Sequence, residues 1–260
     1  MTQAFILAAG QGKRLRPLTN DKPKCLVKLM GKTLLEQQIK TLRKCGIKNI
    51  HIVTGYLKEQ IENLGMNTSF NKEFNSSNMV YSLFSAAPFI KNEDDLIISY
   101  GDIVYEKKNL EALLTCDDEI SLMIDAEWLK LWSLRLENPL DDAETLLMDR
   151  HNYVTELGKK TRSYKNIQGQ YTGLIKIRAD RIEAFINFYR SLNKKSIYDG
   201  RDFNNMYMTS LIQLLINSNW KVRAVLVKNG WLEIDTLKDL SNYESMANNG
   251  SLDKFYKIEK

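Results

Sequence analysis

A glycine-rich, cationic stretch near the start of the sequence contains the residue types that bind phosphate. Gly10 and Gly12 flank a single residue. Cations follow them at Lys13, Arg14, Arg16, Lys22 and Lys24. Glycines let backbone N–H groups close around an anion, and cationic side chains neutralise its charge. The apolar run of residues 4–9 directly before this stretch predicts a buried strand. A buried strand that opens into such a loop predicts a phosphate-binding site.

Two common phosphate-binding motifs do not match this stretch. A Walker loop requires a glycine, four further residues and then Gly-Lys-Ser or Gly-Lys-Thr, an order that is absent here. The dinucleotide-binding fingerprint requires a third glycine at the position of Leu15. The phosphate site is therefore predicted from the composition of the loop, and a basic surface loop with turn glycines is the alternative.

Two aspartates are the candidate ligands for a metal ion. Asp102 follows the apolar run of residues 95–101, and Asp235 follows the run of residues 231–234. Each run should direct its aspartate toward the same edge of a parallel sheet, where ligands bind in open α/β folds. Mg²⁺ is usually held by one or two carboxylates together with phosphate oxygens. The pair predicts a Mg²⁺ site, whereas a single aspartate at a strand end would ordinarily be a cap.

The elements that must position these residues alternate between strands and helices. A capping box, Thr33 with Glu36, predicts the start of a helix that ends at Gly46. Between residues 128 and about 171 the periodicity weakens, and we interpret this segment as an insertion or lid. The order predicts an α/β, Rossmann-like fold, with a mostly parallel central sheet and helices on both faces. Strands are expected at 4–9, 50–53, 95–103, 120–124, 171–177 and 222–227, and further helices at 58–64, 79–86, 110–114, 182–192, 206–216 and 237–246.

The overall composition is typical of a soluble globular chain, and its modest positive charge fits a small anionic substrate as well as it fits nucleic acid. Of the 260 residues, 43% are hydrophobic and 27% are charged, and the net charge is +5. No Lys/Arg run interleaved with aromatic residues indicates nucleic acid, and no apolar run approaches the roughly 20 residues of a membrane span. The first predicted strand begins almost at Met1, which leaves no room for a signal peptide and predicts a cytoplasmic protein.

The histidines and cysteines indicate no other chemistry. His51 lies in an apolar strand and His151 in a polar turn, and neither has a Ser, Cys or second His beside it. The three cysteines form no CxxC pair, so neither a zinc site nor a disulfide framework is indicated. Structural roles are expected for all of them.

Residues 7–24 resemble the signature of nucleotidyltransferases that join a nucleotide to a phosphorylated small molecule. That signature reads Leu-Ala-Ala-Gly-x-Gly-x-Arg-Leu-x-Pro-Leu-Thr, followed after a gap by Pro-Lys, and the sequence matches it at nearly every position. Lys13 departs from it, because many members carry Thr or Ser there. The resemblance continues through residues 31–56. It implies attack of an acceptor phosphate oxygen on a nucleotide, release of pyrophosphate, and Mg²⁺ as the cofactor.

The roles of residues in the nucleotide site follow from this resemblance. Arg14 would hold the leaving β,γ-phosphates, and Lys24 would bridge the α-phosphate and the acceptor phosphate. Asp102 and Asp235 align with the two metal-binding acids of the family. The other residues expected to contact the nucleotide are Leu7, Ala8, Ala9, Gly10, Gly12, Lys13, Tyr56, Asn78 and Ser82.

The chain looks more similar to the cytidylyltransferases that activate phosphocholine, 2-aminoethylphosphonate or phosphoglutamine than to the sugar-phosphate enzymes. CTP as the donor, and a role in capsule or lipopolysaccharide modification, are implied by this resemblance alone. It is carried by residues 78–82, 132–135, 138–144, 169–173 and 231–235. We interpret the chain as a single domain (1–260) with a nucleotide-binding half (1–125), a small acceptor-binding lobe (126–235) and a C-terminal helix and tail (236–260).

The second half offers aromatic and charged side chains for the acceptor. An ammonium group on the acceptor would favour aromatic faces and a carboxylate, whereas packing of the lobe is the alternative for the tryptophans. A phosphoglutamine acceptor would instead use Arg135 or a lysine. Residues 156–160 resemble the family segment whose lysine contacts the acceptor phosphate, and both Lys159 and Lys160 are candidates for that lysine. Surface solvation is the alternative for both. The predicted acceptor-binding residues are Trp132, Glu144, Lys160, Tyr171, Gly173 and Trp231.

Other functions compete with this interpretation. A sugar-1-phosphate nucleotidyltransferase is the first alternative. A non-catalytic regulatory relative is the second, although such chains usually lose the loop cations or metal acids that are present here. A nucleotide-sugar glycosyltransferase is disfavoured, because those enzymes typically bind metal through Asp-x-Asp and only Asp102 stands at that position. We expect a monomer or homodimer that binds CTP and a phosphorylated small-molecule acceptor, with no nucleic-acid or membrane partner.

Overall fold

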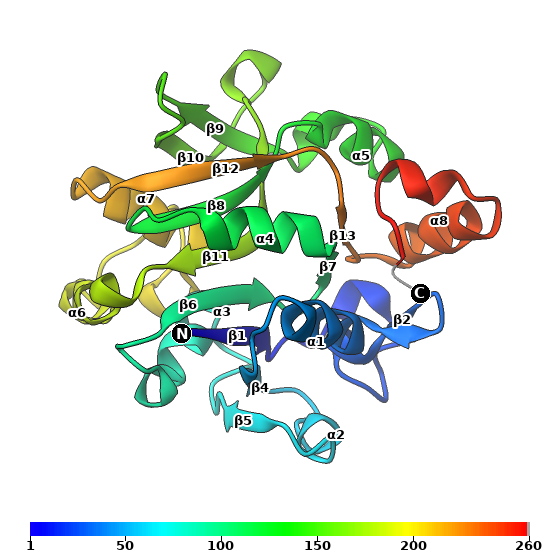
Figure 1. The fold of residues 1–260 in the computed structure, drawn as a ribbon, viewed down its shortest axis with the longest axis horizontal. Coiled ribbons are helices and arrows are strands. Elements are labelled where there is room, and N and C mark those ends of the chain that lie inside the picture. Colours follow the sequence, from blue (N-terminus) through cyan, green and yellow to red (C-terminus); the bar gives the residue numbers. More distant parts are fainter. Residues whose placement is uncertain (259–260) are drawn as a thin grey trace.

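A seven-stranded sheet forms the centre of the computed structural model, which describes residues 1–258 (Figure 1). Its strands are β1 (Thr2–Ala8), β4 (Asn49–Thr54), β5 (Asn67–Phe70), β6 (Asp95–Tyr100), β8 (Ile120–Asp125), β11 (Gln170–Ile177) and β12 (Val222–Val227). Their order across the sheet is β12–β8–β11–β6–β1–β4–β5. Only β11 runs antiparallel to its neighbours among these pairings. The predicted α/β fold with a mostly parallel sheet is therefore confirmed.

Helices complete an apolar core on each side of the sheet (Figure 1). One core includes residues of α1 (Leu34–Lys44), α4 (Lys107–Thr115), α5 (Trp128–Arg135) and α8 (Leu237–Asn248). The other includes residues of α3 (Met79–Ser85), α6 (Ile182–Ser191) and α7 (Met208–Asn217). Side chains alternate along β1, so that Ala4 and Ile6 join the first core while Phe5 and Leu7 join the second. The short helix α2 (Glu59–Glu62) precedes β5.

The start of α1 follows its local sequence. The Thr33 hydroxyl accepts a hydrogen bond from the Glu36 backbone N–H, and the Glu36 carboxylate accepts one from the Thr33 backbone N–H. This is the predicted capping box, which satisfies N–H groups that have no partner within the helix. Gly46 follows the helix with a φ of +82°. A small hairpin of β2 (Lys28–Leu29) and β3 (Lys32–Thr33) leads the chain from the cationic loop into α1.

A second small sheet brings the two candidate metal ligands together. The sequence predicts one strand over residues 95–103, but β6 ends at Tyr100 and a separate strand, β7 (Ile103–Tyr105), follows a turn at Gly101 and Asp102. β7 pairs antiparallel with β13 (Trp231–Glu233), with Ile103 opposite Glu233. The Ile234 N–H also donates to the Asp102 carbonyl oxygen at 3.0 Å. Asp102, before β7, and Asp235, after β13, therefore lie at the same end of this ladder.

The segment interpreted as an insertion or lid contains regular structure. It folds as α5 followed by an antiparallel hairpin of β9 (Glu144–Met148) and β10 (Val154–Lys160). β10 packs against α7. The hairpin and α5 were not predicted, nor was the edge strand β5, whose sequence Asn-Thr-Ser-Phe lacks an apolar pattern.

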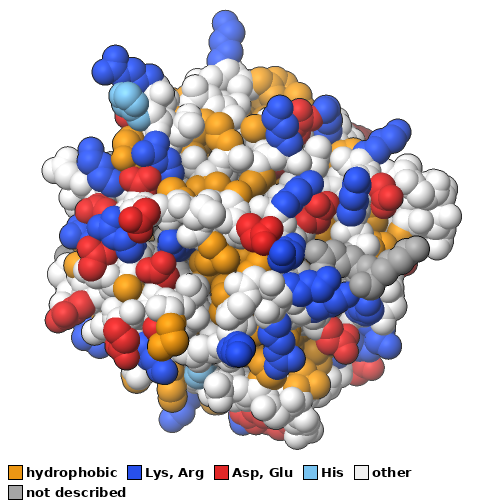
Figure 2. Space-filling model, viewed as in Figure 1, with side chains coloured by type: hydrophobic (Ala, Val, Ile, Leu, Met, Phe, Trp, Pro, Cys, Tyr) orange, Lys and Arg blue, Asp and Glu red, His pale blue; other side chains and the backbone are white. Residues whose placement is uncertain are grey.

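The surface carries charges of both signs. Figure 2 shows Lys and Arg side chains interspersed with Asp and Glu over the face that it presents. The described residues include no helix with the length and apolarity that a membrane crossing requires. All three cysteines are free thiols, and Cys25 is buried.

Candidate active site

A cavity of about 280 Å³ opens at the carboxyl ends of β1 and β6. The residues that the sequence places around a nucleotide contribute most of its wall: Leu7, Ala8, Ala9, Gly10, Gly12, Lys13, Asn78 and Ser82. The two candidate catalytic cations, Arg14 and Lys24, and the two candidate metal ligands, Asp102 and Asp235, line the same cavity. Five further residues that the sequence does not indicate as site residues also line the cavity: Cys25, Phe74, Ser77, Met79 and Gly101. The predicted site residues of the first half thus surround one space.

Tyr56 is the one predicted nucleotide contact that does not line this cavity. Its hydroxyl donates to the Asn20 carbonyl oxygen at 2.9 Å, and its backbone N–H donates to the Ala9 carbonyl oxygen at 3.2 Å. Both acceptors belong to the cationic loop or the residues that lead into it. The contacts indicate that Tyr56 supports the loop from outside.

The backbone of the cationic loop requires glycine at position 12. Gly12 has a φ of +63° and precedes a single 3₁₀ turn, Lys13–Leu15. A side-chain Cβ there would lie 2.9 Å from the Lys24 Cβ. The left-handed backbone and the close approach of Lys24 both exclude a larger residue. Gly12 thereby lets Lys24 pass beside the loop into the cavity.

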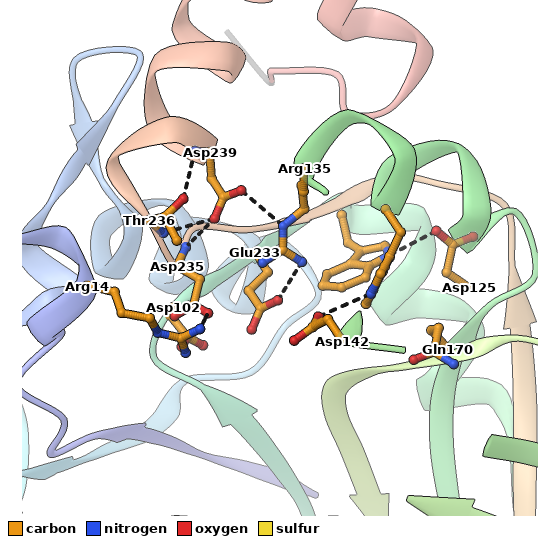
Figure 3. Close-up of polar contacts among 12 residues, drawn as sticks. Arg14, Asp102, Asp125, Arg135, Asp142, Gln170, Glu233, Asp235, Thr236 and Asp239 are labelled. Atoms are coloured by element: carbon orange, nitrogen blue, oxygen red, sulfur yellow. Dashed lines mark hydrogen bonds and ion pairs between the residues drawn. The ribbon is translucent and has the colours of Figure 1, made fainter. Parts of the chain in front are cut away.

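An ion-pair network of Lys24, Arg14, Asp102 and Asp235 occupies the centre of the site. Figure 3 shows Arg14 close to the two aspartates. The Lys24 ammonium lies 2.7 Å from Oδ2 of Asp102 and 2.8 Å from Oδ1 of Asp235. The Arg14 guanidinium lies 2.5 Å from Oδ2 of Asp235. Burial alone would lower the pKa of Lys24, but the charges of Asp102 and Asp235 outweigh it and raise that pKa. Lys24 is therefore a permanent cation, and the two aspartates lie close enough to share one positive charge.

The two aspartates suit a magnesium ion that also binds phosphate. Oδ1 of Asp102 is buried and has no hydrogen-bond partner among the described residues. Residues 1–258 hold no group of three or more His, Cys, Asp or Glu side chains that could bind a metal by themselves. Mg²⁺ commonly takes one or two carboxylates and completes its shell with phosphate oxygens and water. The donor set of Asp102 and Asp235 therefore fits Mg²⁺ bound together with a nucleotide.

A buried amide holds the side of the cavity that Ser77 and Ser82 line. The Asn71 side chain, which is fully buried, donates to the hydroxyls of Ser77 at 3.0 Å and Ser82 at 2.9 Å. Asn78 caps α3, because its side-chain oxygen accepts from the Met79 N–H at 2.8 Å. These contacts fix the polar groups that face the cavity.

Arg135, Glu233 and Asp239 form a second charged network behind Asp235. Of these three, the sequence indicates only Arg135 as a site residue, as an alternative contact for a phosphoglutamine acceptor. Arg135 donates to Glu233 and to Asp239, and Asp239 caps the start of α8 (Figure 3). Burial raises the pKa of Glu233, and the Arg135 charge opposes that rise. The Thr-x-x-Asp pattern of Thr236 and Asp239 is a capping signal that the sequence does contain. Arg135 is engaged in this network, which disfavours the suggestion that it binds an acceptor.

The two tryptophans predicted to bind the acceptor are buried. Trp132 is 4% exposed and Trp231 is 2% exposed, and their ring centroids lie 5.9 Å apart. The indole N–H of Trp132 donates to Asp142 at 3.2 Å, and that of Trp231 donates to Asp125 at 3.1 Å. Packing of the lobe, the alternative for these residues, is what this burial favours.

The other predicted acceptor residues lie in or beside β9, β10 and β11. Glu144 is opposite Lys160 in the hairpin, and the Lys160 side chain is exposed. Burial, with the nearby charge of Asp142, raises the pKa of Glu144 to about 7. Tyr171 contacts the ring of Tyr100 edge-on, with centroids 5.8 Å apart.

Gly173 has a structural reason to be glycine. Its φ is +83°, and a Cβ there would lie 2.6 Å from the Tyr100 ring. Tyr100 directly precedes the Gly101–Asp102 turn. Tyr171 and Gly173 thus adjoin the edge of the site through Tyr100, while the predicted acceptor roles of the whole set stay predictions.

Comparisons with known proteins agree with this geometry. Residues 4–127 match the MobA-like NTP transferase domain. The chain is 41% identical over 246 residues to a CTP:phosphoglutamine cytidylyltransferase from Campylobacter jejuni subsp. jejuni serotype O:2, a match that covers 91% of this chain and 97% of that protein.

Two solved structures share the fold. The inositol-1-phosphate CTP transferase of T. maritima has a TM-score of 0.74 and 22% identity, and covers 99% of this chain and 98% of its own. The CTP:phosphocholine cytidylyltransferase of Streptococcus pneumoniae has a TM-score of 0.69 and 23% identity, and covers 95% of this chain and 99% of its own. With a shared fold and 41% identity across nearly all of the Campylobacter protein, the chain belongs to the nucleotidyltransferase family with a MobA-like NTP transferase domain.

Proposed function

We propose that this protein is a cytidylyltransferase that moves CMP from CTP to a small phosphorylated acceptor and releases pyrophosphate. The observation that carries the proposal is the 41% identity to a CTP:phosphoglutamine cytidylyltransferase over 91% of this chain, because that match spans the acceptor half as well as the loop. Phosphoglutamine is therefore the first candidate acceptor. Modification of a surface polysaccharide is the proposed role, and the cytoplasm, where CTP is made, is the proposed location.

The chain's own cations supply most of the chemistry. An acceptor phosphate oxygen attacks the α-phosphorus of CTP, a new P–O bond forms, and the bond to the bridging oxygen of the β-phosphate breaks so that pyrophosphate leaves. A phosphate monoester such as phosphocholine has a second pKa near 6, so an acceptor of that kind is largely ionised at neutral pH and needs no general base. Lys24 is placed between the two aspartates, from which it can contact the α-phosphate and the acceptor phosphate. Arg14, which is more exposed, contacts the leaving phosphates.

Mg²⁺ is the proposed cofactor, and Asp102 and Asp235 would hold it. When bound, such an ion neutralises the charge of the phosphates and helps to align them. The carboxylates that now pair with Lys24 and Arg14 would then face the ion, which leaves both cationic side chains available to phosphate oxygens.

A pyrophosphate-release assay tests this proposal. CTP, UTP, dTTP, GTP and ATP are each combined with phosphoglutamine, phosphocholine, 2-aminoethylphosphonate or glucose 1-phosphate, in the presence of Mg²⁺. We expect the fastest turnover with CTP and phosphoglutamine, and mass spectrometry should detect the CMP adduct. The Asp102→Ala variant is the control, since it should keep its fold and lose most activity. Turnover only with glucose 1-phosphate would overturn the proposal in favour of a sugar-1-phosphate enzyme, and nucleotide binding without turnover would favour a regulatory protein.

A further inference from the structure

The Asp239 carboxylate holds the backbone on both sides of a candidate metal ligand (Figure 3). Its Oδ2 accepts hydrogen bonds from the backbone N–H of Asp235 at 3.1 Å and of Thr236 at 2.9 Å. These two peptide groups flank the Cα of Asp235. Fixing both of them restricts the φ and ψ angles of Asp235, and hence the direction in which its side chain leaves the backbone.

A buried arginine holds Asp239 in turn. The Arg135 Nε donates to Oδ1 of Asp239 at 3.1 Å, and its NH1 donates to Oε2 of Glu233 at 2.8 Å. Asp239 is 2% exposed and Arg135 is 7% exposed. Buried charges at such positions are stable only when they are paired and hydrogen-bonded. The Arg135 guanidinium therefore holds two carboxylates in place, Glu233 before Asp235 in the sequence and Asp239 after it.

Arg135 reaches this position from the second half of the chain. It is the last residue of α5, and its guanidinium carbon lies 5.4 Å from the centroid of the Trp132 ring. Trp132 in turn contacts Trp231, the first residue of β13. The placement of Asp235 consequently depends on α5 as well as on its own strand.

Helix capping alone does not account for this arrangement. A capping box at Thr236 needs only the Asp239 oxygen that accepts from the Thr236 N–H, and an exposed Asp239 would serve that purpose. Here Oδ1 of Asp239 accepts a hydrogen bond from the buried Arg135 guanidinium, and Oδ2 accepts a further hydrogen bond from the Asp235 backbone N–H. Both additional contacts are directed at the segment that carries the metal ligand.

We propose that Arg135 and Asp239 are positioning residues that orient the Asp235 carboxylate for the metal–nucleotide complex. The inference rests on the proposed function only in that Asp235 is taken as a ligand of the metal. Neighbours that orient a metal ligand typically contribute 10-fold to 100-fold to metal affinity or activity. Loss of either residue should therefore weaken metal binding about 10-fold or more.

Metal binding without turnover is the test. Mn²⁺, which is visible by electron paramagnetic resonance, is titrated into the full chain with CTP present and no acceptor. The variants are Asp239→Asn, which removes the charge that Arg135 pairs with, Arg135→Met, and Arg135→Lys. Thermal unfolding of each variant shows that the fold is retained. We expect Mn²⁺ affinity to fall about 10-fold or more in the first two variants and less in Arg135→Lys, because lysine keeps the charge.

A matched control separates positioning from general stability. Lys176 is also a buried cation, 3% exposed, and its ammonium lies 3.0 Å from Asp95 at the opposite end of β6 from Asp102. Lys176→Met should lower the unfolding temperature and leave Mn²⁺ affinity unchanged.

Three outcomes have separate meanings. The inference would be overturned if folded Arg135→Met and Asp239→Asn both bound Mn²⁺ with wild-type affinity. If Arg135→Met does not fold, wild-type affinity in Arg135→Lys and Asp239→Asn would overturn it instead. Weaker Mn²⁺ binding in Lys176→Met, equal to that in the Arg135 variants, would also overturn it. A wild-type chain that binds Mn²⁺ and CTP but turns over no acceptor would overturn the proposed function, and weaker Mn²⁺ binding by the variants would still support the positioning role.

Discussion

Lys24 is the residue on which the charge balance of the site depends. Its ammonium contacts both candidate metal ligands and would contact both phosphates of the proposed reaction. The sequence identifies Lys24 by its place in the Pro-Lys element of the signature, without showing what it contacts in the absence of substrate. Asp102 and Asp235 are separated from Lys24 in the sequence by 78 and 211 positions, respectively. No local sequence pattern could indicate contacts over such separations.

Replacing Lys24 should separate activity from folding. Lys24→Ala removes a charge that stabilises the phosphates during transfer, and we expect the rate of pyrophosphate release to fall about 100-fold or more. The variant leaves Asp102 and Asp235 close together without the cation between them. Mg²⁺ should therefore raise its unfolding temperature more than that of the wild type. Arg16→Ala, an exposed cation of the same loop that does not line the cavity, is the control and should behave like the wild type. Near-normal turnover by Lys24→Ala would mean that the site is misplaced.

At the scale of elements, the turn between β6 and β7 sets the position of Asp102. Gly101 lies so close to β1 that a Cβ would be 2.6 Å from the Leu7 carbonyl oxygen. The Gly101 N–H donates to that same oxygen at 3.0 Å. The sequence predicts a strand over residues 95–103 that carries Asp102 near its end. It does not predict the turn at Gly101 and Asp102, because the contact of this turn with β1 depends on the tertiary fold.

Gly101→Ala should therefore destabilise the protein. The added methyl group meets a backbone atom that cannot rotate away, so β1 and the turn must separate, at a cost of about 1–3 kcal/mol. Urea unfolding followed by circular dichroism measures this change in the free energy of unfolding. Gly10→Ala is a matched control in the same cavity wall, because a Cβ at Gly10 meets no atom within 4 Å. Equal stability of the two variants would show that the contact between Gly101 and Leu7 is not restrictive.

The elements that the sequence predicts are those with long or punctuated patterns. The sequence predicts the apolar strand β1, the capping box at Thr33 and the alternation of strands and helices, and the structure contains all three. The three-residue strands β7 and β13 are not predicted, since such short segments have no measurable period. These two strands bring Asp102 and Asp235 together, so the residue types of the site were predictable, whereas the means of their juxtaposition was not.

At the scale of the whole molecule, the buried His51 and the half-buried Glu144 give the free energy of unfolding opposite dependences on pH. Burial lowers the pKa of His51, which stacks between Phe5 and Phe89. Its contribution to stability is present above its ordinary pKa of about 6.5 and is lost as the pH falls. Burial raises the pKa of Glu144 to about 7. Its contribution is present below the unfolded value of about 4.3 and is lost as the pH rises through 7.

The contribution of Glu144 can be isolated by comparing variants, because the His51 contribution is common to all of them. Glu144→Gln imitates the protonated side chain, so it should match the wild type in stability near pH 4. Near pH 8 the wild type must hold an ionised, largely buried carboxylate, and Glu144→Gln should be more stable by about 1–3 kcal/mol. Urea unfolding at both pH values measures this difference in the free energy of unfolding.

Glu156 lies in the same hairpin, and its pKa is lowered by a hydrogen bond from Lys159. It is ionised at pH 6 and at pH 8, so Glu156→Gln, measured at pH 6 as well as at pH 8, should show a constant difference from the wild type over that range. A constant difference for Glu144→Gln as well, from pH 4 to pH 8, would place the Glu144 carboxylate in a hydrated setting, open to solvent and to the acceptor.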